Sequence, residues 1–263
     1  MSTLAGVLGF PVRHSRSPAM MNAAFTELGL DWRYVKLAVP PKHFAETARA
    51  LPGSGYGGAN VTIPHKEAAL RLADERGEEA AAIGAANTLT FAGGAIMADN
   101  TDAGGLLDAL GERPGGRSAL VLGAGGAGRA AAWALRQAGA EVAVWNRTAE
   151  RAAALAAELG VHHRERPASA DLLVNATSVG LGVEAEHAVV EALRLDGVEA
   201  ETVVDLVYGE GPTALTSWAR ARGARVVEGS EVLVRQGAHT LERWTGRRAP
   251  LGVMRRALGM DGV

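Results

Sequence analysis

The stretch Ala119-Leu-Val-Leu-Gly123-Ala-Gly125-Gly126-Ala-Gly128 decides the fold of this chain. Its apolar start is typical of a buried strand, and Arg129–Gln137 is typical of a helix. The glycines between them have the spacing Gly-x-Gly-x-x-Gly, which permits a tight turn, close approach of a pyrophosphate and close packing of helix on strand. Free backbone amides at the start of the helix favour an anion. A glycine-rich loop without a ligand is the alternative, but the strand before and the helix after favour a dinucleotide-binding turn.

The end of the next strand, Glu141–Trp145, selects between the two nicotinamide cofactors. An acidic residue there would bind the ribose 2′-hydroxyl of NAD, but this chain has Asn146-Arg147-Thr148. A guanidinium holds a 2′-phosphate through charge-assisted hydrogen bonds, and a threonine hydroxyl adds a donor. We therefore predict NADP as the cofactor. The contacts predicted so far are Gly123, Ala124, Gly125, Gly126, Ala127, Gly128, Asn146, Arg147 and Thr148.

Strand-like and helical segments alternate along both halves of the chain, which predicts an α/β fold with mostly parallel sheets. We expect two domains joined near Asp102–Arg117. The expected strands are Leu4–Leu8, Tyr34–Val39, Asn60–Ile63, Asn87–Phe91, Ala95–Ala98, Ala119–Leu122, Glu141–Trp145, Asp171–Asn175, Thr202–Asp205 and Arg225–Val227. The expected helices are Ser17–Leu28, Pro41–Ala50, Pro64–Arg76, Arg129–Gln137, Glu150–Glu158, Glu186–Leu195, Pro212–Arg222, and two within Ser230–Leu258, broken at Thr245–Pro250.

The composition of the 263 residues excludes several classes of protein. Hydrophobic residues make up 48%, enough for a real core, and the net charge of −2 offers no basic surface for nucleic acid or anionic lipid. There are no cysteines, hence no disulfide and no thiolate metal site. No apolar run reaches the roughly 18 residues of a membrane span, and the amino terminus lacks the pattern of a secretory signal, so we expect a cytoplasmic protein.

The few histidines and lysines carry further information. The histidines show no metal-ligand spacing, so we expect no metal, and we interpret His162-His163 as a solvated turn. Of the 27 basic residues only Lys36, Lys42 and Lys66 are lysines. Each lysine is therefore a better candidate than usual for a role that arginine cannot fill.

Three polar clusters lie where predicted strands of the first half meet helices: Pro11–Pro18, Asn60–Lys66, and Asn87-Thr88 with Asp99–Asp102. Ligands of open α/β sheets bind beyond the carboxyl ends of the strands, so we expect the clusters to converge on one site. Each cluster has a structural alternative, since its polar residues are also good helix caps. The same kind of junction three times over favours a binding site.

The segments GFPVRHSRSPAMMN, ANVTIPHKEAA, GAANTL, DNTDAGG, GAGGAGRA, NRT and NATSVG, followed by DLVY and GSEVLVRQGA, resemble the shikimate dehydrogenase family in order and spacing. The resemblance covers essentially the full chain. It implies the reversible, NADP-dependent reduction of 3-dehydroshikimate to shikimate, a step of the shikimate pathway to aromatic amino acids. It also implies an N-terminal substrate-binding domain of residues 1–102 and 235–263, and an NADP-binding Rossmann domain of residues 103–234.

The resemblance further implies the roles of individual residues, with Lys66 and Asp102 as the catalytic pair. Ser15 and Ser17 would bind the substrate carboxylate. The other implied substrate contacts are Asn60, Thr62, Asn87, Tyr208 and Gln236. The further implied cofactor contacts, on the nicotinamide side, are Thr177, Ser178, Leu206 and Gly229.

The chemistry of a lysine suits the implied reaction. Hydride leaves a carbinol carbon only as the hydroxyl proton also leaves, so a proton acceptor is needed beside that hydroxyl. A buried lysine can release its proton near neutral pH, whereas arginine does not. We favour Lys66 as the proton carrier with Asp102 orienting it, although the sequence leaves open which of the two carries the proton.

The chain departs from the family pattern in two places. The family often has Tyr-x-Pro-x-x-Thr where this chain has Tyr208-Gly-Glu-Gly-Pro212-Thr213, and a methionine common near the nicotinamide is absent from Gly229-Ser-Glu-Val-Leu. The alternatives are an NAD-using quinate/shikimate dehydrogenase, a non-catalytic NADP-binding regulator, and a methylenetetrahydrofolate dehydrogenase, whose pterin substrate would want more aromatic surface. Apart from the small-molecule substrate we expect no partner, neither nucleic acid nor membrane, and the oligomeric state stays open, a homodimer included.

Overall fold

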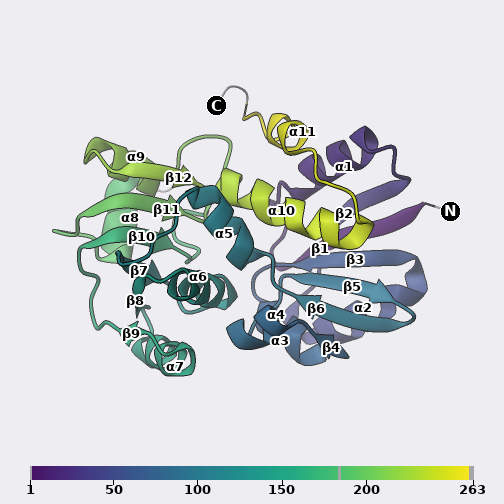
Figure 1. Ribbon diagram of the computed structural model, residues 1–263, viewed down its shortest axis with the longest axis horizontal. Helices are drawn as coiled ribbons and strands as arrows, with labels where there is room; N and C mark the ends of the chain where they lie inside the picture. The colour runs from purple at the N-terminus through teal and green to yellow at the C-terminus, as the bar shows by residue number, and fades with distance from the viewer. Residues whose placement is uncertain (1, 183–184, 261–263) are drawn as a thin grey trace. The chain divides into compact units, whose positions relative to one another are not determined.

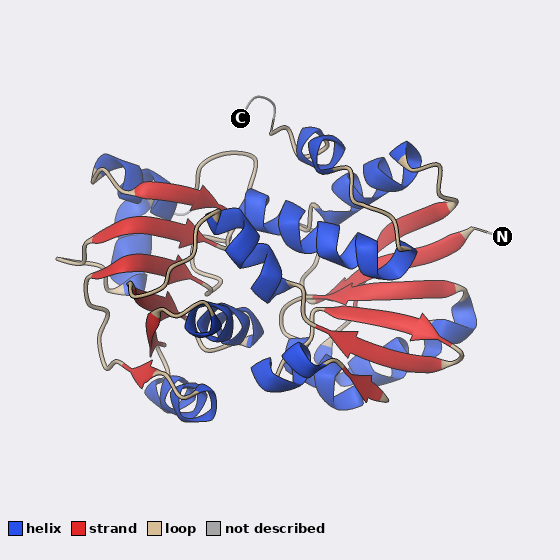
Figure 2. Cartoon of the chain, viewed as in Figure 1, coloured by secondary structure: helices blue, strands red, loops and turns tan. Residues whose placement is uncertain are grey.

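The computed structural model describes residues 2–182 and 185–260 and divides the chain into two compact units. Unit 1 comprises Met1–Gly105 with Leu233–Val263, and unit 2 comprises Leu106–Val232. Both divisions fall inside helices, α5 (Asp102–Leu110) and α10 (Gly229–Thr245). Each unit contains a six-stranded sheet with helices on both faces, which confirms the predicted fold class (Figures 1 and 2).

The strands of unit 1 are β1 (Thr3–Gly9), β2 (Trp32–Ala38), β3 (Tyr56–Val61), β4 (Glu75–Arg76), β5 (Thr88–Ala92) and β6 (Ala95–Asp99). Their order in the sheet is β2-β1-β3-β5-β6-β4, with β5 antiparallel to both neighbours and the other pairs parallel. The expected hairpin is present, and Gly93 and Gly94 supply the positive φ angles of its turn.

The helices of unit 1 that cover its sheet are α1 (Ser17–Glu27), α2 (Phe44–Ala50), α3 (Lys66–Leu72), α4 (Glu78–Ile83), α10 and α11 (Leu251–Arg256). Figure 1 shows α1, α10 and α11 on one side of the sheet and α2, α3 and α4 on the other. Apolar residues of α2, α3 and α4, including Phe44, Leu70 and Ala80, join Leu8 and Leu89 of the strands in one buried cluster. The helices α10 and α1 pack closely at Gly237, where a Cβ would lie 2.4 Å from the Met20 Cε and would displace the end of that side chain.

The strands of unit 2 are β7 (Ser118–Leu122), β8 (Glu141–Trp145), β9 (His162–His163), β10 (Ala170–Asn175), β11 (Ala200–Asp205) and β12 (Arg225–Glu228). They form a parallel sheet in the order β12-β11-β10-β7-β8-β9. The order reverses between β7 and β10, which is where dinucleotides bind in sheets of this topology.

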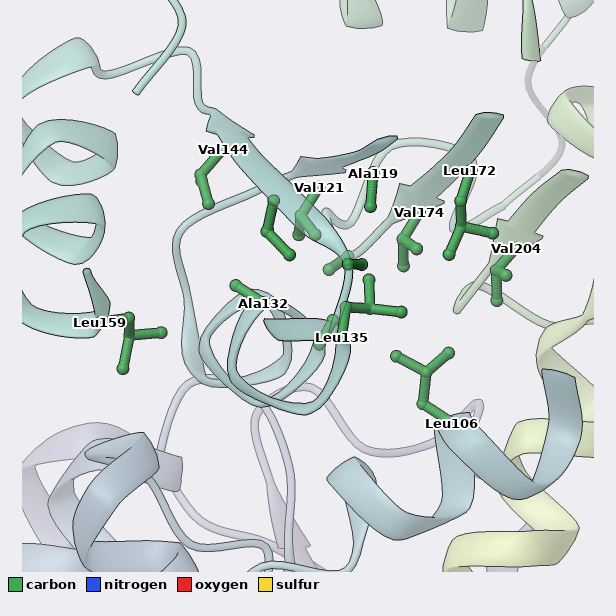
Figure 3. Packing of buried hydrophobic residues seen from close by; sticks show 14 of the residues in the cluster. Leu106, Ala119, Val121, Ala132, Leu135, Val144, Leu159, Leu172, Val174 and Val204 are labelled. Atoms are coloured by element: carbon green, nitrogen blue, oxygen red, sulfur yellow. The ribbon is translucent and has the colours of Figure 1, made fainter. Parts of the chain in front are cut away.

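Alternation along the strands of unit 2 builds two cores. Val121, Val144, Val174 and Val204 face α5, α6 (Gly126–Gln137) and α7 (Ala149–Leu159), and Figure 3 shows these valines around α6. Their neighbours along the strands face α8 (Glu186–Leu193) and α9 (Ala214–Ala221). This period of two with apolar residues on both faces is what a sheet covered by helices on both sides requires.

Two secondary-structure predictions were wrong. The helix expected over Pro64–Arg76 ends at Leu72, because Glu75–Arg76 pairs with β6 as the short strand β4 before α4 begins. His162–His163 is an exposed edge strand rather than a turn, paired with β8. In both cases a neighbouring strand supplies backbone partners that local sequence does not reveal.

Candidate active site

The polar clusters of unit 1 meet at one edge of its sheet. Asn60 near the end of β3 is in register with Val7 of β1 and Thr88 of β5, and Thr88 is in register with Asp99 at the end of β6. Because β5 runs antiparallel to β3 and β6, its amino end shares an edge with the carboxyl ends of β1, β3 and β6. The predicted substrate residues of unit 1 therefore come from one row across the sheet and the loops that leave it.

Lys66 and Asp102 form a close ion pair at this edge. The Lys66 Nζ lies 2.6 Å from the Asp102 Oδ2, and the two side chains are 12% and 17% exposed. Lys66 begins α3 and Asp102 begins α5. The Asn100 side chain accepts from the Asp102 and Ala103 amides and so caps α5, which leaves the Asp102 carboxylate to bind elsewhere. Both charged groups are partly open to solvent, so a small substrate can reach them.

Asn87 connects this ion pair to the rest of the cluster. Its amide nitrogen donates to Asp102 Oδ1 at 2.8 Å and to Gln236 Oε1 of α10 at 3.2 Å. Its amide oxygen accepts from the Thr101 backbone N–H at 2.7 Å. Because a backbone N–H can only donate, this contact fixes the side chain with its nitrogen toward the carboxylate.

Asn60 is fixed in the same way by residues that the sequence interpretation missed. Its oxygen accepts from the Tyr34 hydroxyl at 2.8 Å, and its nitrogen donates to the Asn87 carbonyl at 3.1 Å and the Thr240 hydroxyl at 3.1 Å. Thr240 follows Gln236 by four residues on α10, so it shares its face. That spacing is the signal that could have identified Thr240. Tyr34 gave no such signal, since a tyrosine in a buried strand does not by itself indicate a binding site.

The predicted carboxylate-binding pair, Ser15 and Ser17, is buried where the loop after β1 meets α1, with the two Oγ atoms 3.3 Å apart. Ser15 lies in the loop and Ser17 is the first residue of the helix. Lys36 of β2 donates to the Arg13 carbonyl of this loop. Partial burial lowers the pKa of His14, and the positive charges of Lys36 and Arg13 lower it further. The loop that carries Ser15 and leads to Ser17 is thus in a positive field.

In the polar cluster Asn60–Lys66, two further residues differ in their surroundings: His65 belongs to the core and Thr62 to the edge of the sheet. His65 is 2% exposed, stacks on Phe44 and places its Nε2 2.7 Å from the Val39 carbonyl. Burial lowers its pKa, against the raising effect of the Val39 carbonyl. His65 is thus a neutral core residue, whereas Thr62 is half-buried just after β3.

In unit 2 the glycine turn has the geometry that its spacing predicts. Gly123 has φ +111°, and a Cβ there would lie 2.9 Å from the Ala176 carbonyl oxygen. A Cβ at Gly128 would lie 2.0 Å from the Gly123 oxygen, so only glycine lets α6 start this close to the turn. At Gly125 a Cβ would meet no protein atom within 4 Å, so packing within the protein does not require a glycine there.

The segment after β8 lies against this turn. The Asn146 oxygen accepts from the Ala124 backbone N–H at 3.3 Å, and its nitrogen donates to the Thr148 carbonyl at 2.9 Å. Arg147 and Thr148 are exposed. The structure also places Arg151, which the sequence interpretation did not include, exposed in the first turn of α7.

Polar side chains also gather at the ends of β10 and β11 in unit 2. Asn175 donates to Asp205 Oδ1 at 2.9 Å and accepts from the Thr177 backbone N–H at 3.1 Å. Ser178 is exposed and Leu206 and Tyr208 are half-buried, all in segments that leave these strands. Gly229 is buried at the start of α10.

Comparison with known proteins identifies the family. The shikimate dehydrogenase substrate binding domain matches residues 7–89, the shikimate/quinate 5-dehydrogenase domain residues 109–207, and the shikimate 5′-dehydrogenase C-terminal domain residues 229–258. A shikimate dehydrogenase (NADP(+)) of Anaeromyxobacter dehalogenans is 46% identical over 98% of this chain and 96% of its own length. The chain belongs to the shikimate dehydrogenase family.

Two solved structures illustrate the range of related enzymes. The shikimate 5-dehydrogenase of Thermus thermophilus, in complex with NADP(H) and shikimate, is 41% identical with a TM-score of 0.85, over 98% of both chains. The 5-ketofructose reductase of a Gluconobacter strain is 30% identical with a TM-score of 0.83, again over 98% of both chains. The fold is thus shared with an enzyme named for a different substrate, so the residues of the site, and not the fold, determine which substrate is bound.

The described residues contain neither a metal-binding cluster nor a membrane-spanning helix. Over 2–182 and 185–260 there is no group of three or more His, Cys, Asp or Glu side chains arranged to hold a metal ion. Within the same ranges no helix has the length and apolarity needed to cross a membrane.

Proposed function

We propose that this protein is an NADP-dependent oxidoreductase that interconverts 3-dehydroshikimate and shikimate by hydride transfer, a step of the shikimate pathway to aromatic amino acids. The observation that carries this proposal is the Lys66–Asp102 ion pair, 2.6 Å long and held in place by the Asn87 amide. It lies among hydroxyl and amide side chains rather than in an apolar pocket. A small, polyhydroxylated acid is the kind of ligand that such a set of short polar groups binds.

On the substrate side we assign the carboxylate to Ser15 and Ser17, in the positive field of the Arg13 loop. Hydroxyl groups are common donors to carboxylates, and the field draws an anion toward them. The ring hydroxyls are assigned to the amides and hydroxyls at the end of the sheet. The residues proposed for this role are Asn60, Thr62, Asn87 and Gln236. Tyr208 is likewise proposed as a substrate contact.

Lys66 and Asp102 perform the proton transfer in this proposal. In the oxidative direction the substrate hydroxyl loses its proton to the Lys66 Nζ while the C–H bond breaks and the C–O bond becomes a carbonyl. Lys66 enters this step as the neutral amine and leaves it as the ammonium. The Asp102 carboxylate, held by Asn87, accepts a hydrogen bond from the Lys66 Nζ, which orients the amine and stabilises the ammonium that forms. NADP supplies the nicotinamide carbon that accepts or returns the hydride.

The glycine turn and the segment after β8 fit NADP. Gly125 has no packing reason to be glycine, whereas close approach of a pyrophosphate provides one. Asn146 holds the turn against the end of β8, and the exposed Arg147 and Thr148 suit a 2′-phosphate. Arg151 adds a second exposed guanidinium close by. We assign the pyrophosphate to the turn, Gly123 to Gly128, and the nicotinamide side to Thr177, Ser178, Leu206 and Gly229.

Steady-state kinetics test the proposal. Shikimate and quinate, each with NADP⁺ and with NAD⁺, are compared by their kcat/KM values, and we expect the highest value for shikimate with NADP⁺. A higher value for quinate with NAD⁺ would support the quinate/shikimate alternative and refute this assignment. 5-Ketofructose with NADPH is the third comparison, because it is a neutral sugar that gives the positive loop of Ser15 nothing to attract. Turnover of it above that of 3-dehydroshikimate would also refute the assignment.

We also propose a division of roles between the domains, a cellular location and an oligomeric state. We assign substrate binding to residues 1–102 with 235–263, and NADP binding to residues 103–234. We further propose a cytoplasmic location, which cell fractionation tests, and a homodimer, which sedimentation equilibrium tests.

A further inference from the structure

Asp205, the last residue of β11, is a buried carboxylate for which the structure shows no cationic partner among the described residues. It is 0% exposed. It accepts three hydrogen bonds, from the Thr213 hydroxyl at 2.6 Å, the Asn175 amide at 2.9 Å and the Val207 backbone N–H at 3.1 Å. Burial raises the pKa of Asp205 to about 6 in spite of these bonds, and the nearby Glu228 carboxylate adds to the rise.

Burying a carboxyl group without a counter-ion is unfavourable, so its retention calls for a structural reason. Here the three donors come from three different segments: the end of β10, the chain leaving β11 and the residue that caps α9. Asp205 therefore ties together the three loops at this edge of the sheet.

The hydrogen bonds of Asp205 continue through Asn175 into the loop after β10. Asn175, which donates to Asp205, accepts from the Thr177 hydroxyl at 2.7 Å as well as from its backbone N–H. The Thr177 oxygen in turn accepts from the Val179 backbone N–H at 3.0 Å. One carboxylate thus sets the conformation of residues 175–179 through a chain of hydrogen bonds.

The start of α10 fits closely against the backbone of the segment that leaves β11. A Cβ at Gly229 would lie 2.6 Å from the Asp205 carbonyl oxygen and 2.5 Å from that of Val207. The backbone around residue 229 can therefore approach only as long as the chain leaving β11 keeps its path. That path is set in part by the bond from Val207 to the Asp205 carboxylate.

The sheet order indicates which part of a dinucleotide this edge would meet. A dinucleotide lies across the point where strand order reverses, with one nucleotide over each half of the sheet. The glycine turn and Arg147 lie on the β7–β8 side, where the adenosine 2′-phosphate is proposed to bind. The other nucleotide, which carries the nicotinamide, therefore lies over the ends of β10 and β11.

We propose that Asp205 is a positioning residue for the nicotinamide half of NADP, which acts through Asn175, Thr177 and the chain leaving β11 without touching the cofactor. The inference rests on the proposed NADP function. It separates Asp205 from the residues of the glycine turn, which serve the adenosine half.

The test compares whole NADP⁺ with adenosine 2′,5′-bisphosphate, a probe that lacks the nicotinamide nucleotide. Dissociation constants for both are measured by titration calorimetry on wild-type protein, Asp205→Ala and Asp205→Asn. We expect Asp205→Ala to raise the dissociation constant of NADP⁺ about tenfold or more, which is the scale of losing one hydrogen bond to a charged group. The dissociation constant of the bisphosphate should change less than about twofold. Asp205→Asn keeps the size and one acceptor oxygen, so it should rescue NADP⁺ binding to within about threefold of wild type.

A matched control separates positioning from general stability. Val203→Ala removes buried methyl groups from the same strand and leaves the hydrogen bonds of Asp205 intact. It should leave both constants unchanged. In steady state, Asp205→Ala should raise the KM for NADP⁺ more than the KM for shikimate.

Equal weakening of both ligands by Asp205→Ala, or no weakening of either, overturns the inference, as does a Val203→Ala effect of the same size. If Asp205→Ala does not fold, Thr213→Val removes one donor and Thr213→Ser retains it, and the same selective loss is expected only for the valine variant. Wild-type protein that binds neither ligand overturns the proposed function itself. Wild-type protein that binds both while the variants bind like it overturns only the role of Asp205.

Discussion

Replacing Asp205 with asparagine should change how the stability of unit 2 depends on pH. The pKa of Asp205 rises from 3.8 in a model peptide to about 6 in the folded protein, because the carboxyl group is buried. Between these values the folded protein holds a proton that the unfolded chain has released. The free energy of unfolding therefore falls as pH rises through this interval, the reverse of the usual carboxylate behaviour.

The size of the effect follows from the shift. About 2 pKa units correspond to about 3 kcal/mol, a contribution present below about pH 4 and lost by about pH 7. Asparagine does not titrate, so this contribution to the pH dependence disappears in the variant. Relative to Asp205→Asn, wild-type unit 2 should lose about 3 kcal/mol between those pH values.

Urea unfolding at a series of pH values measures the difference. Hydrogen exchange of peptides from β10 and β11 monitors unit 2 by itself, which avoids assuming that both units unfold together. The other carboxylates titrate in both proteins and cancel in the comparison. Val203→Ala serves as control, with a constant offset from wild type at every pH. A constant offset for Asp205→Asn as well, or a wild type that gains stability over the variant as pH rises, would refute the reasoning.

Three further predictions concern the proposed site. Lys66→Ala should lower kcat about 10²-fold or more, and Lys66→Arg should not restore it, because arginine does not release its proton; Lys42→Ala, an exposed control, should be neutral, and near-normal turnover of Lys66→Ala would contradict the assigned role. Arg147→Ala should raise the KM for NADP⁺ about 10-fold while leaving the low activity with NAD⁺ unchanged, since a charge-assisted hydrogen bond contributes about 1.5–3 kcal/mol; equal loss with both cofactors would count against a 2′-phosphate contact. Lys36→Met should lower kcat/KM for shikimate at low ionic strength and weaken its dependence on salt, more than Arg33→Met at the other end of β2 does; the same salt dependence in wild type and Lys36→Met would exclude the positive loop as a source of attraction.

The parts of the fold that local sequence predicted are those in which steric demands are local. Gly123 and Gly128 were placed correctly because a positive φ angle and a contact of 2.0 Å can be met only by glycine. The strands of unit 2 were found because apolar residues on both faces of a covered sheet give continuous apolar runs. The break between α10 and α11 follows from Gly246 and Pro250.

The elements that were missed depend on distant partners. The strand β4 exists because Glu75 pairs with Met97, and no property of Glu75 indicates this. The helix α4 then begins at Glu78, after a glycine whose Cβ would lie 2.3 Å from the Asp99 Oδ1. The strand β9 is likewise defined by its pairing with β8. A periodicity of side chains cannot reveal such short pairings.

The candidate site shows the same division. The junctions of strands and helices predicted that Lys66, Asn87 and Asp102 would come together, and the structure brings them to one edge of the sheet. The contributions of Tyr34 and Thr240 required the fold, because each reaches Asn60 from an element distant in sequence.

The way the amides are fixed explains why this edge suits a hydroxylated ligand. An asparagine side chain can exchange donor and acceptor by rotating through a half turn, which would reverse what it offers to a hydroxyl. Asn87 cannot rotate without losing the bond from the Thr101 backbone N–H, since its nitrogen would then face another donor. Its nitrogen is thereby committed to Asp102 and Gln236, so the orientation of Asn87 is fixed before a ligand arrives. Such preorganisation avoids rearrangement during the reaction, and it lets neutral side chains hold the Lys66–Asp102 pair in one geometry.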